Sequence, residues 1–166
     1  TWDYDVAAYD TATWEQVFRM FPPEDAAYKR VNECRPSPDG ARLAVAHDDG
    51  AVRIHDTATG ALLHTLRQQA EGARLPQNDV VWLPGGHRVA TVSKDLTLRI
   101  WDAETGEHLS VWHGHEQTAT AVAVTSDGSA LFSGDAGGVV RRWDLAALTS
   151  ERSRWPLPDT GYAIAV

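Results

Sequence analysis

The densest group of residues that could do chemistry is His113-Gly114-His115-Glu116. Two imidazoles and a carboxylate can bind zinc, because zinc takes nitrogen and oxygen ligands in a tetrahedral arrangement. A zinc site needs three or four converging ligands, and the other histidines have no matched spacing: His47, His55, His64, His87 and His108. We therefore expect no metal.

No nucleophile motif accompanies these histidines. The chain has no Gly-x-Ser-x-Gly sequence, no glycine-rich loop ending in lysine and no metalloprotease helix motif. Cys34 is the only cysteine, and we expect it to pack within a strand, because a reactive thiolate needs an electropositive and partly exposed setting. The sequence thus predicts no catalytic residues and no cofactor. We therefore expect that the protein is not an enzyme.

Charge and hydropathy restrict the partners and the location. The 166 residues carry 15 Lys and Arg against 23 Asp and Glu, a formal net charge of −8. This field repels phosphate backbones, so we expect no nucleic acid. No apolar stretch approaches the roughly 18 residues that span a bilayer, and no leader opens the chain, so we expect no membrane. A single cysteine fits a reducing compartment, and we expect the cytoplasm.

One short pattern occurs four times and always ends in aspartate: Val6-Ala-Ala-Tyr-Asp10, Val52-Arg-Ile-His-Asp56, Leu98-Arg-Ile-Trp-Asp102 and Val140-Arg-Arg-Trp-Asp144. The aspartates stand 46, 46 and 42 residues apart, and the turn glycines Gly40, Gly86 and Gly128 keep the last two steps. Two independent markers with one period indicate a repeat architecture. Between them lie short alternating segments bounded by Asp- and Gly-rich turns, which predict an all-β fold.

The period, the Trp-Asp pairs, the Ser-Pro-Asp-Gly turn that ends at Gly40, and Gly114-His115 resemble the WD-repeat family. The resemblance covers essentially the whole chain and implies a β-propeller of four-stranded antiparallel blades. It divides the chain into a half-blade, three blades and the start of a further strand: 1–22, 23–67, 68–112, 113–159 and 160–166. Propellers of this family usually close with more blades, typically about seven, so the ring is predicted to be incomplete.

In this family a buried polar network links a histidine, a hydroxyl on the second strand, an aspartate in the next turn and the tryptophan. The resemblance implies His115, Ser133 and Trp143 in the last blade, with Gly137 where the aspartate belongs. It implies Asp95, Trp101 and the candidate hydroxyl Ser93 in the blade before, and Asp49 in the blade that has His55 in place of tryptophan. Since each set is partial, we expect apolar packing to hold the blades.

The resemblance also implies a binding face, because partners of WD-repeat proteins commonly meet the connections between blades and the turns of each second hairpin. The candidate partner contacts on that face are Lys29, Asp48, Arg74, Gln77, Lys94 and Gln117. The face carries mixed charge with an acidic lean, which predicts a protein or peptide ligand of basic character. The expected function is that of a protein–protein interaction scaffold or recognition module.

Two other functions remain open at this point. Bacterial-looking propellers of this family are often attached to a kinase, a protease or a nucleotide-hydrolysing switch domain, so the chain could be the sensor or targeting module of a larger enzyme. Alternatively, copies could self-assemble through open ends, because the first strand leaves an unpaired edge. The missing blades would come from the same polypeptide, which the start at Thr1 favours, or from another subunit. We expect Trp2, Trp14 and Trp155 to cover a blade outside this chain.

Overall fold

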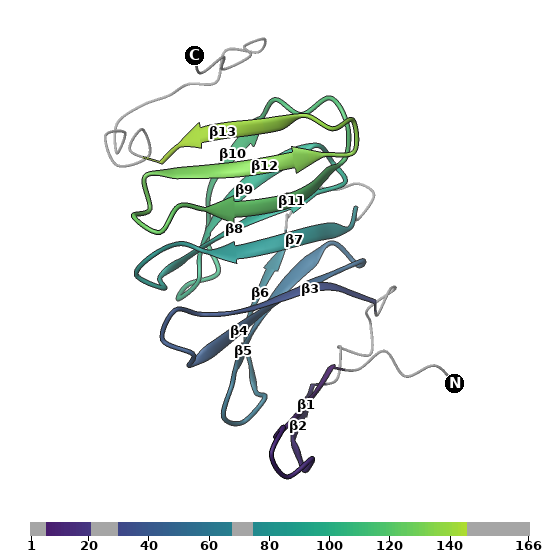
Figure 1. Ribbon diagram of the computed structural model, residues 1–166, viewed down its shortest axis with the longest axis vertical. Coiled ribbons are helices and arrows are strands. Elements are labelled where there is room, and N and C mark those ends of the chain that lie inside the picture. Colours follow the sequence, from purple (N-terminus) through teal and green to yellow (C-terminus); the bar gives the residue numbers. More distant parts are fainter. Residues whose placement is uncertain (1–5, 21–29, 68–74, 146–166) are drawn as a thin grey trace.

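The computed structural model describes residues 6–20, 30–67 and 75–145, and these ranges hold thirteen strands in four antiparallel sheets (Figure 1). Within every sheet, neighbouring strands follow one another along the chain, so each sheet is a meander. No helix occurs in the described ranges, and none that could cross a membrane was found there. The predicted all-β architecture is confirmed.

The first sheet is a two-stranded hairpin of β1 (Val6–Tyr9) and β2 (Gln16–Met20). The first blade holds β3 (Val31–Pro36), β4 (Arg42–His47), β5 (Ala51–Asp56) and β6 (Leu62–Arg67). The second blade holds β7 (Gln77–Trp82), β8 (Arg88–Ser93), β9 (Thr97–Asp102) and β10 (His108–His113). The third blade holds three described strands, β11 (Ala119–Val124), β12 (Ala130–Asp135) and β13 (Val140–Asp144).

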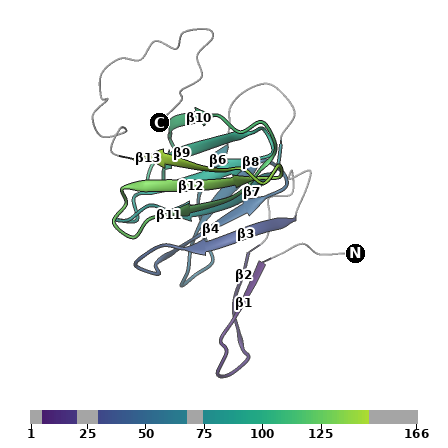
Figure 2. The ribbon, with the colours of Figure 1, turned by 45° about the horizontal axis from the view of Figure 1, so that its top comes forward.

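The sheets stack in chain order, and the described residues do not close into a ring (Figures 1 and 2). This confirms the predicted incomplete propeller. The fourth strand expected for the last blade, and the strand expected at 160–166, lie outside the described residues.

Each blade has two faces, because side chains alternate along a strand and directly opposed residues share a face. In the first blade the register pairs Ala46 with Val52 and Val52 with Leu66, so these three side chains project together. They pack against the second blade, and we call this the front face of a blade; the back face looks toward the preceding sheet. The repeat therefore sets front against back at every junction.

Two apolar cores fill the junctions between blades. The front of the first blade packs against the back of the second, through Ala44, Ala46, Val52, Ile54, Leu66, Val80, Trp82, Val89, Trp101 and Ala103. The front of the second blade packs in the same way against the third, through Leu83, Ala90, Val92, Leu98, Ile100, Ala119, Val122, Leu131 and Leu145. Burial of these side chains stabilises the stack by roughly 25 cal/mol per Å² of apolar surface removed from water.

Polar contacts recur across the same junctions. Asn32 Nδ2 donates to the carbonyl of Gln77 at 2.9 Å, and Asn78 Nδ2, 46 residues later, donates to the carbonyl of Ala119 at 2.7 Å. Trp82 Nε1 also donates across the first junction, to the carbonyl of Arg35 at 2.8 Å. These bonds satisfy buried donors and fix the offset between neighbouring blades.

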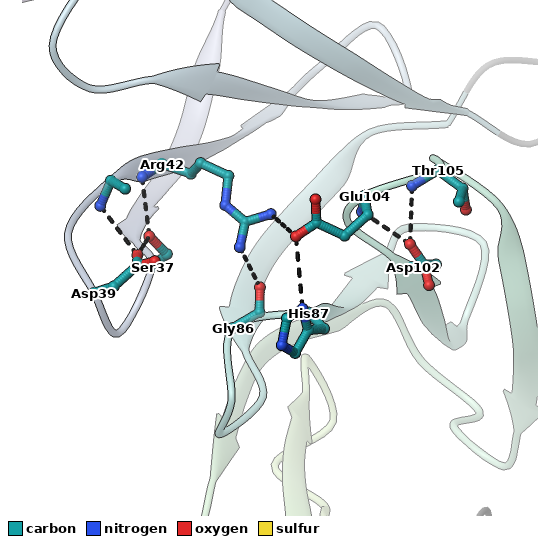
Figure 3. A network of polar contacts seen from close by, with 9 residues as sticks. Ser37, Asp39, Arg42, Gly86, His87, Asp102, Glu104 and Thr105 are labelled. Carbon is teal, nitrogen blue, oxygen red and sulfur yellow. Dashed lines mark hydrogen bonds and ion pairs between the residues drawn. The ribbon is translucent and has the colours of Figure 1, made fainter.

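Figure 3 shows a larger polar bridge between the first and second blades, centred on Arg42. Its guanidinium donates to the carbonyl of Gly86 at 2.7 Å and to Glu104 Oε1 at 2.6 Å, and it lies 5.0 Å from the centre of the Trp82 ring. Glu104 also faces His87 Nδ1, at 3.6 Å. The bridge joins turns of two blades at one end of the stack.

That end, which we call the turn end, holds the turns after the first and third strand of each blade, and Thr57 N donates there to the carbonyl of Ala41 at 3.0 Å. The opposite end, the entry end, holds the segments that enter each blade and the turns after each second strand. Asp48 N donates there to the carbonyl of Arg30 at 3.0 Å. The described part of the entry end comprises Arg30, 48–50, 75–76, 94–96, 114–118 and 136–139.

Candidate functional site

The third blade contains a continuous buried polar network. Trp143 Nε1 on β13 donates to Ser133 Oγ on β12 at 2.8 Å, and Ser133 Oγ lies 2.6 Å from His115 Nε2. His115 Nδ1 in turn lies 2.9 Å from Asp135 Oδ2. In the arrangement that uses every donor, the Ser133 hydroxyl donates to Nε2 and Nδ1 donates to the carboxylate. A saturated buried network of this kind fixes one local geometry.

The expectation that this blade lacks its acid was wrong. Gly137 does stand at the aligned position, but Asp135, two residues earlier at the end of β12, supplies the carboxylate. The bond from His115 lowers the pKa of Asp135, and although desolvation raises it, bonds from the backbone N–H groups of Val139 and Gly137 lower it further.

In the second blade the hydroxyl was misassigned. Trp101 Nε1 donates to Thr91 Oγ1 at 3.0 Å, whereas Ser93 Oγ donates to the carbonyl of Pro76 at 2.9 Å. Thr91 precedes Ser133 by 42 residues, which is the repeat step. Asp95 pairs with Arg99 at 2.6 Å. Burial raises the pKa of Asp95, but its bonds to Thr97 and Arg99 outweigh burial and the pKa is lowered.

The first blade replaces the network with an ion pair cluster. Asp49 is buried and accepts from Arg53 and Arg67, with Arg67 Nη2 at 2.9 Å from Oδ2. Burial raises the pKa of Asp49, but Arg53 and the other donors outweigh burial and lower it. His55, at the tryptophan position, lies 3.1 Å from the carbonyl of Gly60. The first blade thus combines the expected apolar packing with this ion pair cluster.

His47 is a buried imidazole without hydrogen bonds in the same blade. Neither ring nitrogen has a partner, and the side chain lies at the end of β4. Burial lowers its pKa from 6.5 to about 4, with a further contribution from the Arg53 charge. The equivalent residues of the other blades, Ser93 and Asp135, each bond to the segment entering their blade. His47 is thus the one of these three positions that is not satisfied.

The structure separates the predicted partner contacts into three groups. Lys94 and Gln117 are exposed at the entry end. Asp48 is half-buried and accepts from Asn32 Nδ2 at 2.7 Å. Gln77 is buried, so its side chain is not displayed on the surface as the binding-face prediction required. Lys29 and Arg74 lie outside the described residues.

Two apolar side chains at the entry end escaped the sequence-based prediction. Leu96 and Val139 are exposed in the turns after the second strands of the second and third blades. Leu96 has a φ of 72°, where the other blades place Gly50 and Gly138 with φ of 81° and 83°. The left-handed conformation costs a non-glycine residue roughly 1–2 kcal/mol. The repeat spacing was the signal that could have revealed Leu96.

Metal and nucleophile chemistry receives no support from the described geometry. Across residues 6–20, 30–67 and 75–145, no three His, Cys, Asp or Glu side chains come together as a metal site. His115 is committed to Ser133 and Asp135. Cys34 lies within strand β3, as expected, but its side chain is exposed rather than packed.

Comparison with known families agrees with this geometry. The model of the anaphase-promoting complex subunit 4 WD40 domain matches residues 5–78. The model of the WD domain, G-beta repeat, matches residues 60–102 and 106–144. No curated protein matches the chain in sequence. Domains of this kind generally mediate protein–protein interaction and are typically non-enzymatic scaffolds. The repeated blades, their Trp-Asp strands and these matches place the chain in the WD-repeat family.

Proposed function

We propose that the chain is a cytoplasmic protein-recognition module that binds a protein or peptide at the entry end of its second and third blades. The observation that carries this proposal is the group of exposed side chains there without an internal role: Lys94, Leu96, Gln117 and Val139. None of them makes a side-chain hydrogen bond or ion pair within the described ranges. A rigid sheet that displays free side chains on its turns suits recognition.

The turn end contrasts with this surface. There the aspartates Asp39, Asp56, Asp102 and Asp127 accept hydrogen bonds from their own turns. Arg42 and Glu104 hold each other across the blade junction. Side chains already engaged in this way must break bonds before they can bind a partner, whereas Lys94 and Gln117 need not. The difference favours the entry end as the binding surface.

Leu96 adds an energetic argument. A strained backbone conformation persists where the surrounding structure imposes it, and such residues cluster at functional sites. Here the strain coincides with an exposed apolar side chain beside the free ammonium of Lys94. The described exposed charges of the entry end are of both signs, Arg30 and Lys94 against Glu116. We therefore propose a partner that presents an apolar side chain next to a carboxylate, rather than the basic ligand expected from the acidic lean of the predicted face.

The test is affinity capture from cell extract on the immobilised chain. The variant Lys94→Glu combined with Leu96→Gly should lose the bound protein, because it reverses the charge and removes the apolar contact. Ala58→Glu, an exposed change at the turn end, is the matched control and should retain it. Loss of the bound protein with Ala58→Glu, and retention with the entry-end variant, would contradict the proposal.

A further inference from the structure

Beyond recognition at the entry end, the hairpin β1–β2 carries an exposed apolar surface on its back face. Tyr9, Trp14 and Val17 are 53%, 76% and 54% exposed. Tyr9 stands 46 residues before His55, which places it at the repeat position of Trp101 and Trp143. Those two tryptophans pack against the preceding blade. The hairpin thus carries an aromatic residue, Tyr9, at the position that packs against a preceding blade in the other repeats, but here the side chain is exposed.

Trp14 strengthens this interpretation, because its turn occurs three times among the described residues with the same hydrogen bonds. Trp14 N, Gly60 N and Gly106 N donate to the carbonyls of Asp10, Asp56 and Asp102 at 2.7, 2.9 and 3.0 Å. All three residues have positive φ, of 59°, 73° and 75°. Where two repeats use glycine in this conformation, the hairpin holds a tryptophan.

The direction of the Trp14 side chain follows from the other two turns. A Cβ built on Gly60 meets Phe18 of the preceding sheet at 3.1 Å, and one built on Gly106 meets Leu66 Cδ2 at 3.7 Å. Phe18 and Leu66 both lie on the outermost strand of the sheet before. A side chain at this turn position therefore points toward the outermost strand of the preceding sheet. Among the described residues no sheet precedes the hairpin, so the side chain of Trp14 is left exposed.

The front face of the third blade is the matching half of such a junction. Val140 on β13 is 70% exposed, and Phe132 and Ala123 on the same face are also exposed. The equivalent residues of the second blade, Leu98 and Ala90, are fully buried under the third blade. One chain therefore exposes a front face at one end of its stack and a back face at the other.

We propose that these two surfaces bind each other between copies of the chain, head to tail, with the hairpin of one copy on the third blade of the next. The front-to-back junction already occurs twice between the three described blades, so the contact would continue an interface that the fold uses. At the two internal junctions Ile54 and Trp101 belong to one apolar core, and Ile100 and Trp143 belong to the other. The same registration sets Arg142 opposite Tyr9 of the second copy, where a guanidinium can lie over the ring.

The hairpin contains only the two outer strands of a blade, which limits its reach. In the complete blades these correspond to the third and fourth strands, so the hairpin covers Val140 on the third strand of the third blade. Ala121 and Ala123, on the innermost strand β11, lie beyond it. Val140 and Trp14 are therefore the residues on which the contact depends.

A head-to-tail contact is heterologous, so each copy has one donor and one acceptor surface and association continues beyond a dimer unless a ring closes. Sedimentation velocity of the purified chain over a range of concentrations should show mass above the monomer that increases with concentration. Because the chain carries a net charge of −8, added salt should strengthen association by screening repulsion.

Two variants each remove one surface. Trp14→Gly removes the indole and relieves the backbone strain, and Val140→Glu places a charge on the front face; each should weaken association by about 30-fold. The matched control is Leu96→Gly, which also replaces a positive-φ residue by glycine but lies at the entry end, and it should associate like the parent chain. Circular dichroism checks that each variant folds.

The mixture of the two variants is the decisive sample. Trp14→Gly keeps its front face and Val140→Glu keeps its hairpin, so together they should form one-to-one dimers and nothing larger. A parent chain that stays monomeric at every concentration overturns the proposal, as does a mixture that stays monomeric. Equal loss of association in Leu96→Gly also overturns it. The capture experiment for the entry end is independent of these outcomes.

Discussion

The Nδ1 atom of His115 lies 2.9 Å from Oδ2 of Asp135, a residue that ends strand β12 rather than sitting in the turn that follows it. The carboxylate of this network is therefore defined by its distance from the imidazole and not by its place in the repeat. Asp95 and Asp49, at the usual place in the other two blades, instead bind arginines. The carboxylate thus pairs with an arginine in the first two blades and with a histidine in the third.

Moving the acid tests this relationship. Asp135→Ala should lower the melting temperature, because it leaves the buried Nδ1 of His115 without a partner. Gly137→Asp alone should also lower it, since its Cβ would lie 3.2 Å from Asp135 Oδ1 and would bring two carboxylates together. In the double variant the second change should recover part of the loss. Thermal unfolding measures all three, and purely additive losses would contradict the account.

The hydroxyl positions of the second and third blades differ in how many bonds they make. Ser133 Oγ bonds to both Trp143 and His115, whereas Thr91 Oγ1 bonds to Trp101. Ser133→Ala should therefore cost about 2–3 kcal/mol of unfolding free energy and Thr91→Val about 1 kcal/mol. Urea denaturation measures both. An equal or reversed order would show that Ser133 does not link the network.

His47 should make stability depend on pH in the mildly acidic range. The pKa of His47 is about 4 in the folded chain, whereas its ordinary value is 6.5. Between these two pH values the unfolded chain therefore binds a proton at this residue and the folded chain does not. The stability from this group is complete above pH 6.5 and falls until about pH 4, by up to about 3 kcal/mol. His47→Leu should remove most of this slope, because an apolar side chain needs no partner there. An unchanged slope between pH 4 and 6.5 in urea titrations would rule His47 out.

The two charged residues of the bridge in Figure 3, Arg42 and Glu104, should contribute unequally to the free energy of unfolding. Arg42 is largely buried, bonds to the Gly86 carbonyl and lies against Trp82. Arg42→Ala should therefore cost about 2 kcal/mol. Glu104 is more than half exposed, and Glu104→Ala should cost less than about 1 kcal/mol, since an exposed ion pair contributes little. Unfolding in low and high salt measures both, and a larger loss for Glu104→Ala would contradict this account.

The repeat period was enough to predict the blades, because a step of 46 or 42 residues sets every strand and turn at once. It did not predict the polar partners. Asp135 serves a role expected at position 137, and Thr91 rather than Ser93 bonds to the tryptophan, since which side chains meet depends on the face of the strand as well as on the spacing. Register within the sheet settles this, and it appears only in three dimensions.

The candidate binding surface was predicted in part for a similar reason. The entry end follows from the order of the strands, and Lys94 and Gln117 are exposed there. Gln77 was misjudged because the first residue of β7 is covered by its neighbours. The positions of Leu96 and Trp14 could have been identified from the sequence, because each replaces a turn glycine of the other repeats. Their exposure, which makes them interesting, follows only from the packing of whole blades.

Photo-crosslinking tests the central claim, that the chain recognises proteins through its entry end, most directly. A photoreactive residue is placed at position 94, at the entry end, or at position 58, at the turn end; both native side chains are exposed. We expect position 94 to give discrete protein adducts in cell extract and position 58 to give none above background. Adducts from position 58 with none from position 94 would contradict the claim.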